Sequence, residues 1–538
     1  MAMKLVTVGE MRSIEQAANE RGTTFADMMQ KAGEGVALEI QKLFEDNEGE
    51  HIAVGLVGSG NNGGDALVAL TALAGFGWKV RAYLLAKRTK SDPVWSAYSE
   101  THQEALFSDQ DPDFGQLDDW IEDCNVLVDG VLGTGIKLPL KAEVGRVLGH
   151  VSKMENLPMV VAVDCPSGVD CDSGKLADET IPADLTVTMH AVKTGLLTFP
   201  AYKMVGELAV VDLGLPDDLA EDMAIRRWVV DEELVASWLP QRPLDAHKGT
   251  FGTAVVVAGS VNYTGAVYLA SRAAYRIGAG LVQAAVAGPL QAALAGHLPE
   301  VTWILLPNEL GVIAENAADV LLNNIGRATA ILIGPGFGME ESTAAFMKRM
   351  FGTHHQKRAG IGFLGAGESN DQSDSAKLPP LVVDADGLKL LAKLPDWWKG
   401  LPAEAVLTPH PGEMAILTGL PTAEIQADRL GKAVEFARKW GHVVVLKGAL
   451  SVIAAPDGRA AVIPVATAAL AKAGTGDVLA GIIVGLRAQG LAAFEAACTG
   501  AWIHAQAGLE AAERIGSEAA VLAGDVLESI PTVLEDLE

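Results

Sequence analysis

Short apolar runs alternate with helix-like stretches along most of the chain. Residues 10–44 carry apolar side chains at helical spacing, and Gly22-Thr23-Thr24 predicts a break into two helices. Alternation of strand and helix signals predicts mostly parallel sheets covered by helices. The strand-like runs lie at 52–57, 80–85, 126–128, 160–163, 185–187 and 208–211, and then at 254–258, 281–286, 331–333, 381–383, 406–407, 443–446 and 452–454.

Residues 228–248 interrupt this alternation, because they carry three consecutive acids, Pro240 and Pro243 but no strand signal. A chain of 538 residues is also too long for one ordinary core. We therefore expect two α/β domains, residues 1–228 and 229–538, and the lack of a sequence repeat argues against duplication. Residues 352–380 hold few apolar residues and predict a solvated insertion, although His354-His355 could contact a metal.

Composition narrows the classes of partner and compartment. The net charge of −27, from 68 acidic and 41 basic residues, argues against a nucleic-acid partner or an anionic membrane surface. The four cysteines form no metal-ligand pattern and no disulfide framework, which predicts free thiols in a reducing cytosol. The N-terminus has no signal-peptide pattern and no apolar run is long enough to span a bilayer, so we expect a cytoplasmic protein.

Polar residues follow several predicted strands of the first half. The loop Gly58–Asp65 follows the first strand, Asp129 leads into a glycine-containing loop at 133–139, and Asp164 precedes Ser167. Ligands bind beyond the carboxyl ends of strands in open α/β sheets, so these residues predict one polar pocket. Asn62, Asp129 and Ser167 offer oxygens that suit an alkali or alkaline-earth cation, and Asp164 could act as a general acid or base. The alternative is that these acids only cap helices or loops.

The second half places Ala473-Gly474-Thr475-Gly476-Asp477 before a helix-like stretch. Backbone amides in such a loop can stabilise a transferring phosphoryl group, and Asp477 could accept a proton from an attacking hydroxyl or simply cap its helix. His410 stands between two prolines and could contact a ring, or be an ordinary loop histidine. Neither glycine-rich loop has the Lys-Ser/Thr pair of a Walker loop or the spacing of a dinucleotide-binding fingerprint.

Asn-Asn-Gly-Gly-Asp, Asp129 with Gly-Thr-Gly, and Asp164 with Pro-Ser-Gly resemble the NAD(P)H-hydrate epimerase family over residues 1–228. The resemblance implies a Rossmann-like α/β/α sandwich, Asp164 as the catalytic residue, and a potassium ion held by Asn62, Asp129 and Ser167. It also implies inversion at C6 of a hydrated nicotinamide ring. The implied substrate-binding residues are Asn61, Asn62, Gly63, Gly64, Asp65, Gly133, Thr134, Gly135, Ile136, Lys137, Leu138, Pro139 and Asp164.

Gly-Thr-Gly-Asp resembles the ribokinase-like superfamily, and Thr-Pro-His-Pro-Gly-Glu with Lys-Gly resembles, more narrowly, the ADP/ATP-dependent NAD(P)H-hydrate dehydratases over residues 229–538. The resemblance implies a ribokinase-like α/β/α domain that uses ADP as the phosphoryl donor, with ATP as the alternative, and magnesium on the nucleotide phosphates. Ala473 stands where the family usually has glycine. The implied hydrate-binding residues are Ala266, Gly338, His410 and the catalytic Asp477, and the implied nucleotide-binding residues are Lys447, Gly448, Ala449, Leu450, Ser451 and Gly476.

Together these resemblances imply a bifunctional repair enzyme for NADHX and NADPHX. One half would interconvert the R and S hydrates, and the other would dehydrate the S form at the expense of ADP or ATP, giving AMP and phosphate when ADP is used. One alternative is a small-molecule kinase fused to a non-catalytic ligand-binding domain. Another is a binding scaffold for RNA-associated partners, which the acidic charge disfavours. The apolar N-terminal helices could supply the interface of a homo-oligomer.

Overall fold

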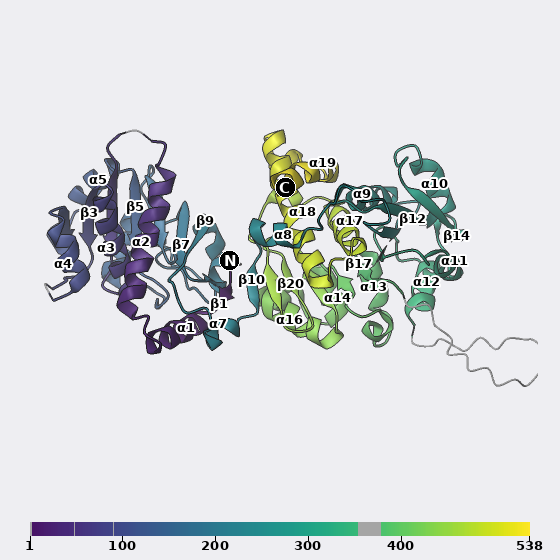
Figure 1. The fold of residues 1–538 in the computed structure, drawn as a ribbon, viewed down its shortest axis with the longest axis horizontal. Helices are drawn as coiled ribbons and strands as arrows, with labels where there is room; N and C mark the ends of the chain where they lie inside the picture. Colours follow the sequence, from purple (N-terminus) through teal and green to yellow (C-terminus); the bar gives the residue numbers. More distant parts are fainter. Residues whose placement is uncertain (1–2, 48, 90, 353–377, 538) are drawn as a thin grey trace, which may run out of the picture. The chain divides into compact units, whose positions relative to one another are not determined.

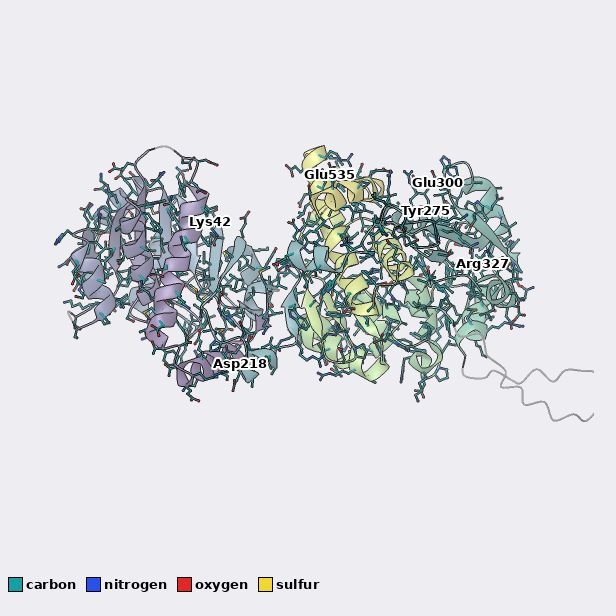
Figure 2. All side chains as sticks on the ribbon, in the orientation of Figure 1. Lys42, Asp218, Tyr275, Glu300, Arg327 and Glu535 are labelled. Atoms are coloured by element: carbon teal, nitrogen blue, oxygen red, sulfur yellow. The ribbon has the colours of Figure 1, made fainter. Side chains whose placement is uncertain are left out.

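The computed structural model describes residues 3–47, 49–89, 91–352 and 378–537 and shows two compact α/β units, Met3–Val229 and Val230–Glu538 (Figure 1). Figure 2 shows charged side chains such as Lys42 and Asp218 in the first unit and Glu300 and Arg327 in the second, all of them exposed. None of the described helices is long and apolar enough to cross a bilayer. The insertion predicted at 352–380, including His354-His355, lies almost entirely outside the described residues.

The sheet of the first unit is parallel throughout, as the alternating pattern predicts, with strand order β4-β3-β2-β5-β6-β7-β9. The edge strand β4 was not predicted, although Ala105-Leu106-Phe107 is an apolar run, and its side chains are exposed or half-buried. The strands are β2 (Ile52–Val57), β3 (Lys79–Leu84), β4 (Glu104–Phe107), β5 (Val126–Gly130), β6 (Met159–Val163), β7 (Leu185–Met189) and β9 (Glu207–Val211).

Helices cover both faces of this sheet, because successive side chains of a strand point to opposite faces. Ala53 and Val57 of β2 pack into one core, whereas Val54 and Leu56 pack into the other. The first core includes α1 (Val8–Glu20), α2 (Phe25–Leu43), α3 (Asn61–Gly75) and α4 (Pro93–Glu100), and the second includes α5 (Gly115–Glu122) and α6 (Ala142–Val151). The predicted helix break is confirmed, since Thr24 begins α2 in a capping box with Asp27.

A short second sheet links the residues before α1 to the residues that follow β7. β1 (Leu5–Val6) pairs in parallel with β8 (Val192–Lys193). The unit continues through α7 (Ala220–Met223) and ends with β10 (Arg227–Val229). Residues 228–248, where the sequence gives no strand signal, include the end of β10 at Val229 and then α8 (Glu232–Trp238), which begins where Asp231 accepts a hydrogen bond from the Leu234 N–H.

The main sheet of the second unit runs β21-β20-β19-β18-β17-β16-β11-β12-β13 and is parallel from β19 to β13, with β20 and β21 antiparallel. The α/β prediction is therefore confirmed here too, although the predicted strands did not include β13 to β15 or β21. The strands are β11 (Thr253–Val257), β12 (Leu281–Ala287), β13 (Thr302–Leu306), β14 (Asn308–Glu309), β15 (Val312–Ile313), β16 (Ala330–Ile333), β17 (Leu381–Val383), β18 (Val406–Leu407), β19 (Val443–Leu446), β20 (Val452–Ala454) and β21 (Ala460–Val462).

One helix of this unit, α17 (Thr475–Ala488), is buried around nearly its whole circumference. Its glycines allow close packing, since a Cβ on Gly481 would lie 2.4 Å from the carbonyl oxygen of Ala270 on α9. This packing fixes the position of Asp477 in its first turn. The remaining helices are α9 (Thr264–Arg276), α10 (Gly288–Leu294), α11 (Ala317–Asn324), α12 (Glu341–Phe351), α13 (Asp386–Leu391), α14 (Pro411–Thr418), α15 (Thr422–Ala427), α16 (Arg429–Trp440), α18 (Ala493–Ile515) and α19 (Ala523–Asp536).

The close approach of α2 to α3 gives a stability prediction. A Cβ on Gly33 would lie 2.4 Å from the Val68 Cβ and 2.6 Å from the Asp65 carbonyl oxygen, so Gly33→Ala must force the helices apart. We expect a loss of about 1–3 kcal/mol in the free energy of unfolding of the first unit. Gly75→Ala is the matched control, because nothing lies within 4 Å of a Cβ there. It should be neutral or stabilise by about 0.5–1 kcal/mol. Urea unfolding and hydrogen exchange of α3 peptides measure both.

Candidate functional sites

The first candidate site begins with the glycine-rich loop after β2. No side chain caps α3 among the described residues, so the N–H groups of its first turn face the loop. Gly63 must be glycine, because a Cβ there would lie 2.1 Å from the carbonyl oxygen of Gly58. Arg88, which the sequence analysis missed, donates to the carbonyl oxygens of Gly58 (2.8 Å) and Gly60 (3.2 Å). The loop is thus held rigidly at a helix N-terminus, where an anionic group is stabilised.

Asn62, Asp129 and Ser167 lie together at the ends of neighbouring elements. The Ser167 hydroxyl donates to Asp129 Oδ1 (2.6 Å), and the Ser167 N–H donates to Oδ2 (2.8 Å). Asn62 Nδ2 donates to the Leu132 carbonyl oxygen at 3.0 Å, and Ser167 Oγ lies 3.3 Å from the same oxygen. Asp129 is fully buried, and this burial raises the pKa of its carboxyl despite the bonds from Ser167.

Asp164 follows β6 with a φ of 65°, a left-handed conformation that aims its side chain at the β7–β8 turn. The Lys193 ammonium, 1% exposed, pairs with Asp164 Oδ1 at 2.6 Å. Thr188 Oγ1 (3.0 Å) and the Met189 N–H (3.3 Å) donate to the same oxygen. Lys193 also donates to Thr188 Oγ1 and to the Met189 carbonyl oxygen, both at 3.0 Å. Three donors therefore fix Oδ1, and no hydrogen bond from the described residues reaches Oδ2.

Two further acids surround this ion pair. Burial raises the pKa of Asp65 well above its ordinary value, and the negative charges of Asp164 and Glu15 add to the rise. Burial also raises the pKa of Glu15, with Lys193 acting in the opposite direction. Glu15 comes from α1 and Asp65 from α3, so four elements contribute charges to one site. No sequence signal marks Glu15, whereas Lys193 stands directly at a strand end.

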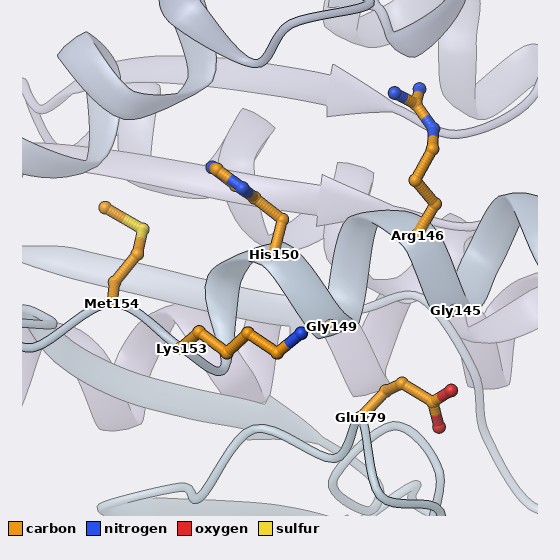
Figure 3. Close-up of a pocket in the computed structure, with 7 residues that line it drawn as sticks. All are labelled: Gly145, Arg146, Gly149, His150, Lys153, Met154 and Glu179. Carbon is orange, nitrogen blue, oxygen red and sulfur yellow. The ribbon is translucent and has the colours of Figure 1, made fainter.

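The loop at 133–139 borders the site but is less constrained. A Cβ on Gly133 would lie 3.3 Å from the Asn62 side chain, which places the start of the loop beside Asn62. Residues from Thr134 to Pro139 are half-buried or exposed. A cavity of about 550 Å³ lies elsewhere, along α6, where Arg146, His150, Lys153 and Glu179 line it (Figure 3). None of the predicted site residues lines that cavity.

The second candidate site centres on an ion pair at the ends of β17 and β19. Lys447 Nζ lies 2.6 Å from Asp384 Oδ1 and 3.9 Å from Glu413 Oε2. Thr408 Oγ1 donates to the same Asp384 oxygen at 2.7 Å. Burial alone would lower the pKa of Lys447, but Asp384 and Glu413 outweigh it and the pKa is raised. Lys447 is therefore charged. Gly476 lies next to this ammonium group, since a Cβ on Gly476 would be 3.6 Å from Lys447 Nζ.

Asp477, in the first turn of α17, lies beside this pair. Burial, with the negative charges of Asp384 and Asp386, raises the pKa of Asp477 to about 7, and Lys447 opposes the rise. A carboxyl with a pKa near 7 can both accept and return a proton at neutral pH. The predicted proton-transfer role thus has the electrostatic environment that it needs.

His410 begins α14 rather than standing free in a loop. Its Nδ1 accepts from the N–H groups of Gly412 (3.0 Å) and Glu413 (3.3 Å), and the Glu413 carboxylate accepts from the His410 N–H (3.0 Å). Burial lowers the pKa of His410, with Lys447 adding to the effect and Glu413 opposing it. His410 Nε2 lies 3.4 Å from Glu413 Oε1, so both nitrogens of the ring face the helix cap and its half-exposed face is left to contact a ligand.

The other predicted residues of this half occupy two regions. The Gly338 N–H donates to Asp386 Oδ2 at 3.0 Å, and Ala266 lies against Gly336 of the same loop. On the nucleotide side, Ser451 Oγ donates to the Gly448 carbonyl oxygen at 2.9 Å. Leu450 is buried, so only its backbone can face a ligand, and Ala449 is exposed.

The sequence analysis missed Asp384, Asp386 and Lys389 in this half. Asp384 directly follows β17, so the strand-end rule that selected Asp129 and Asp164 would have found it. Lys389 pairs with Asp386 at 3.0 Å one turn into α13, which no strand-end rule detects. The chain therefore has two candidate catalytic sites, one in each α/β unit. Each site contains a lysine and several acidic side chains near the carboxyl ends of the strands.

Comparisons with known proteins agree with this division. The family model described as NAD(P)H-hydrate dehydratase matches residues 254–532, and the model described as YjeF-related protein N-terminus matches residues 25–195. The bifunctional NAD(P)H-hydrate repair enzyme Nnr of Moorella thermoacetica is 35% identical over 542 residues, which cover 100% of this chain and 97% of the relative. The enzyme of the same name from Escherichia coli is 32% identical and covers 97% and 92%.

Among solved structures, the ADP/ATP-dependent NAD(P)H-hydrate dehydratase of Bacillus subtilis is 30% identical, covers 58% of this chain and 98% of its own, and has a TM-score of 0.47. The chain belongs to the bifunctional NAD(P)H-hydrate repair enzymes, which combine an epimerase with a dehydratase. Similarity along the full length favours this function over the fused kinase and over the binding scaffold.

The raised pKa of Asp477 gives a pH prediction for the dehydratase. A base must be ionised, so kcat/KM should rise with pH through about 7. Asp477→Asn should lower kcat about 10²–10⁴-fold at every pH and remove the rise of kcat/KM with pH. A pH-independent wild-type kcat/KM between about pH 6 and 8 would contradict the assignment.

The same residue predicts a change in stability. The folded-state pKa of about 7 exceeds the unfolded value of about 4, so the folded state binds the proton more tightly. This stabilisation is complete below the unfolded pKa and is lost as pH rises through about 7. Relative to wild type, Asp477→Asn should therefore raise the unfolding temperature more at about pH 8 than at about pH 5, measured by calorimetry.

Proposed function

We propose that the two sites perform the two reactions separately: the Asp164 site inverts C6 of the nicotinamide hydrate, and the Asp477 site dehydrates the S form. The observation that supports this assignment most directly is that each acid lies beside a lysine near the carboxyl ends of the strands, the buried Lys193 in one unit and the half-buried Lys447 in the other. Each unit thus has its own proton-transfer group.

In the first site, the N–H groups at the start of α3 bind the substrate's phosphates, and the loop at 133–139 borders the nicotinamide. The rigid Gly58–Gly60 turn, held by Arg88, keeps those N–H groups in place. Asp164 presents its unengaged Oδ2 to the hydrated ring. In this arrangement, residues Asn61 to Asp65 and Gly133 to Pro139 contact the substrate.

The proposal includes a potassium ion that binds to Asn62, Asp129 and Ser167. The donor set fits: Asp129 is fully buried, and the groups that act on its carboxyl are the neutral donors Ser167 and Val131. A buried carboxylate without a cationic partner is costly, and a bound monovalent cation would offset that cost. The ion would supply positive charge beside the substrate loop.

In the second site, Asp477 accepts the proton of the C6 hydroxyl while that oxygen takes a phosphoryl group from the nucleotide. Hydroxide is a poor leaving group, whereas phosphate departs readily once C5 loses a proton. Lys447 to Ser451 and Gly476 contact the nucleotide, and Ala266, Gly338 and His410 contact the hydrate. The Bacillus subtilis relative was co-crystallised with ATP and Mg²⁺. Here Mg²⁺ would be held mainly through the phosphates, since the described residues form no cluster of three metal-binding side chains.

The proposal also includes a compartment and an oligomeric state: the protein is cytoplasmic and forms a homo-oligomer. The four cysteines are free thiols, which suits a reducing compartment. Phe25, Leu38 and Leu43 of α2 are exposed apolar side chains that a second copy could cover. Light scattering of the purified chain measures the oligomeric state, and a monomer at micromolar concentration would contradict this part.

The main test starts from mixed hydrate epimers with ADP or ATP and follows the absorbance of the reduced nicotinamide. The wild type should recover the whole substrate and release inorganic phosphate. Asp164→Asn should stall after the S form is consumed, with R-to-S conversion reduced about 10²–10⁴-fold. Its dehydration of pure S hydrate should be unchanged, which controls for folding. A stable phosphorylated product from the wild type would instead indicate a kinase.

The potassium site gives a separate prediction. Exchange of potassium for a bulky organic cation should slow epimerisation but leave Asp164 intact. Asp129→Asn removes the charge that holds the ion, so it should weaken potassium activation roughly tenfold or more. Epimerisation rates across a potassium titration measure both effects. Equal rates with and without potassium would exclude the site.

A further inference from the structure

The turn between β17 and α13 places two aspartates on either side of one strained residue. Ala385 has a φ of 52° and a ψ of −124°, a conformation that favours glycine. Asp384, which precedes it, pairs with Lys447 at 2.6 Å. Asp386, which follows it, begins α13 and reaches the Gly338 loop instead. Such backbone strain persists only where the surrounding packing fixes the turn, and here it directs the two carboxylates to different partners.

Asp386 holds the loop that follows β16. Its Oδ2 accepts a hydrogen bond from the Gly338 N–H at 3.0 Å, and its Oδ1 accepts one from Lys389 Nζ at 3.0 Å. Gly338 has a φ of 80°, so the loop bends sharply at the residue that Asp386 engages. Both carboxylate oxygens are therefore occupied, one by the loop and the other by a lysine one turn along the same helix.

Lys389 also lies beside the acid that holds His410. Its Nζ is 4.0 Å from Glu413 Oε1, and the Glu413 side chain is 3% exposed. Glu413 Oε2 accepts a hydrogen bond from the His410 N–H at 3.0 Å, and Oε1 lies 3.4 Å from His410 Nε2. Asp386, Lys389 and Glu413 therefore form a line of alternating charge from the Gly338 loop to the His410 cap.

We propose that Asp386 and Lys389 are positioning residues of the dehydratase, which fix the spacing between the Gly338 loop and the His410 cap and so the width of the subsite for the hydrated ring. This inference rests on the proposed role of Gly338 and His410 in binding the hydrate. Asp386 acts through the Gly338 N–H. Lys389 acts through Asp386 and Glu413.

The packing of α13 separates this role from a purely structural one. Leu388, Leu390 and Leu391 of the same helix are buried, at 1% exposure or less, so apolar contacts hold the helix in place. The Lys389 side chain is 33% exposed, and a partly exposed ion pair contributes little to the free energy of unfolding. Loss of the Lys389 charge should therefore leave the helix folded and change the spacing of the two loops.

The test is Lys389→Met, which keeps an unbranched side chain but removes its charge. The KM for the S hydrate should rise about tenfold or more, as expected for the loss of a charge-assisted hydrogen bond. The KM for the nucleotide should change little, because the proposed nucleotide contacts of residues 447–451 are kept. Lys389→Arg retains the charge and should restore most of the wild-type hydrate KM.

Lys399→Met is the matched control. Lys399 pairs with Asp396 at the same i,i+3 spacing and at 2.8 Å, but has no second acidic partner among the described residues. Its substitution should leave both KM values unchanged, and the unfolding temperature of each variant checks that the second unit remains folded. An unchanged hydrate KM in Lys389→Met, or an equal rise in the hydrate and nucleotide KM values, would overturn the proposal.

A double-mutant cycle gives a second readout. Asp386→Ala removes both the acceptor of the Gly338 N–H and the partner of Lys389, so it should raise the hydrate KM at least as much as Lys389→Met. The double variant should raise it by clearly less than the product of the two single effects, because Lys389 reaches the Gly338 loop only through Asp386. A full product of the two effects would show that the residues act independently and would overturn their shared role.

The dehydratase variants separate this inference from the proposed function. An active Asp477→Asn enzyme would remove the proposed function, whatever the Lys389 variants show. An inactive Asp477→Asn enzyme together with an unchanged hydrate KM in Lys389→Met and Asp386→Ala would remove only this inference.

Discussion

The ion pair between a buried or half-buried lysine and a strand-end aspartate is the interaction on which both sites depend. Lys193 holds Asp164 at the end of β6, and Lys447 holds Asp384 at the end of β17. A buried charge is costly unless it is paired, so each lysine needs its acid, and the pair in turn sets the electrostatic conditions for every neighbouring acid.

The two sites use this interaction differently. In the first unit the lysine pairs with the proposed catalytic aspartate itself, which orients Asp164 and leaves its Oδ2 without a hydrogen bond from the described residues. In the second unit the lysine pairs with a neighbour, and Asp477 is left partly uncompensated with a pKa of about 7. One arrangement supports a fixed base, and the other supports a group that exchanges its proton near neutral pH.

Much of the fold could be predicted from the sequence, because each buried parallel strand is a continuous run of apolar residues. Such a run can be recognised without knowing the rest of the structure. The two-residue strand β14 could not be predicted, since both of its side chains are exposed, and β4 was missed at the sheet edge, where two of its four side chains are exposed. The strand-end rule selected Asp129 and Asp164 and would also have found Asp384. It could not select Glu15 or Lys389, which lie on helices and reach their sites only through packing.

The sequence by itself determined the two α/β sheets, the glycine loops and the acids that follow the strands, because these features depend on neighbouring residues. Only the tertiary structure decided which charges meet. β1 pairs with β8 and brings Glu15 of α1 toward Asp65 and Lys193, although more than 170 residues separate Leu5 from Val192. Burial and the distance between charges set a proton affinity, and both arise only when remote segments pack together.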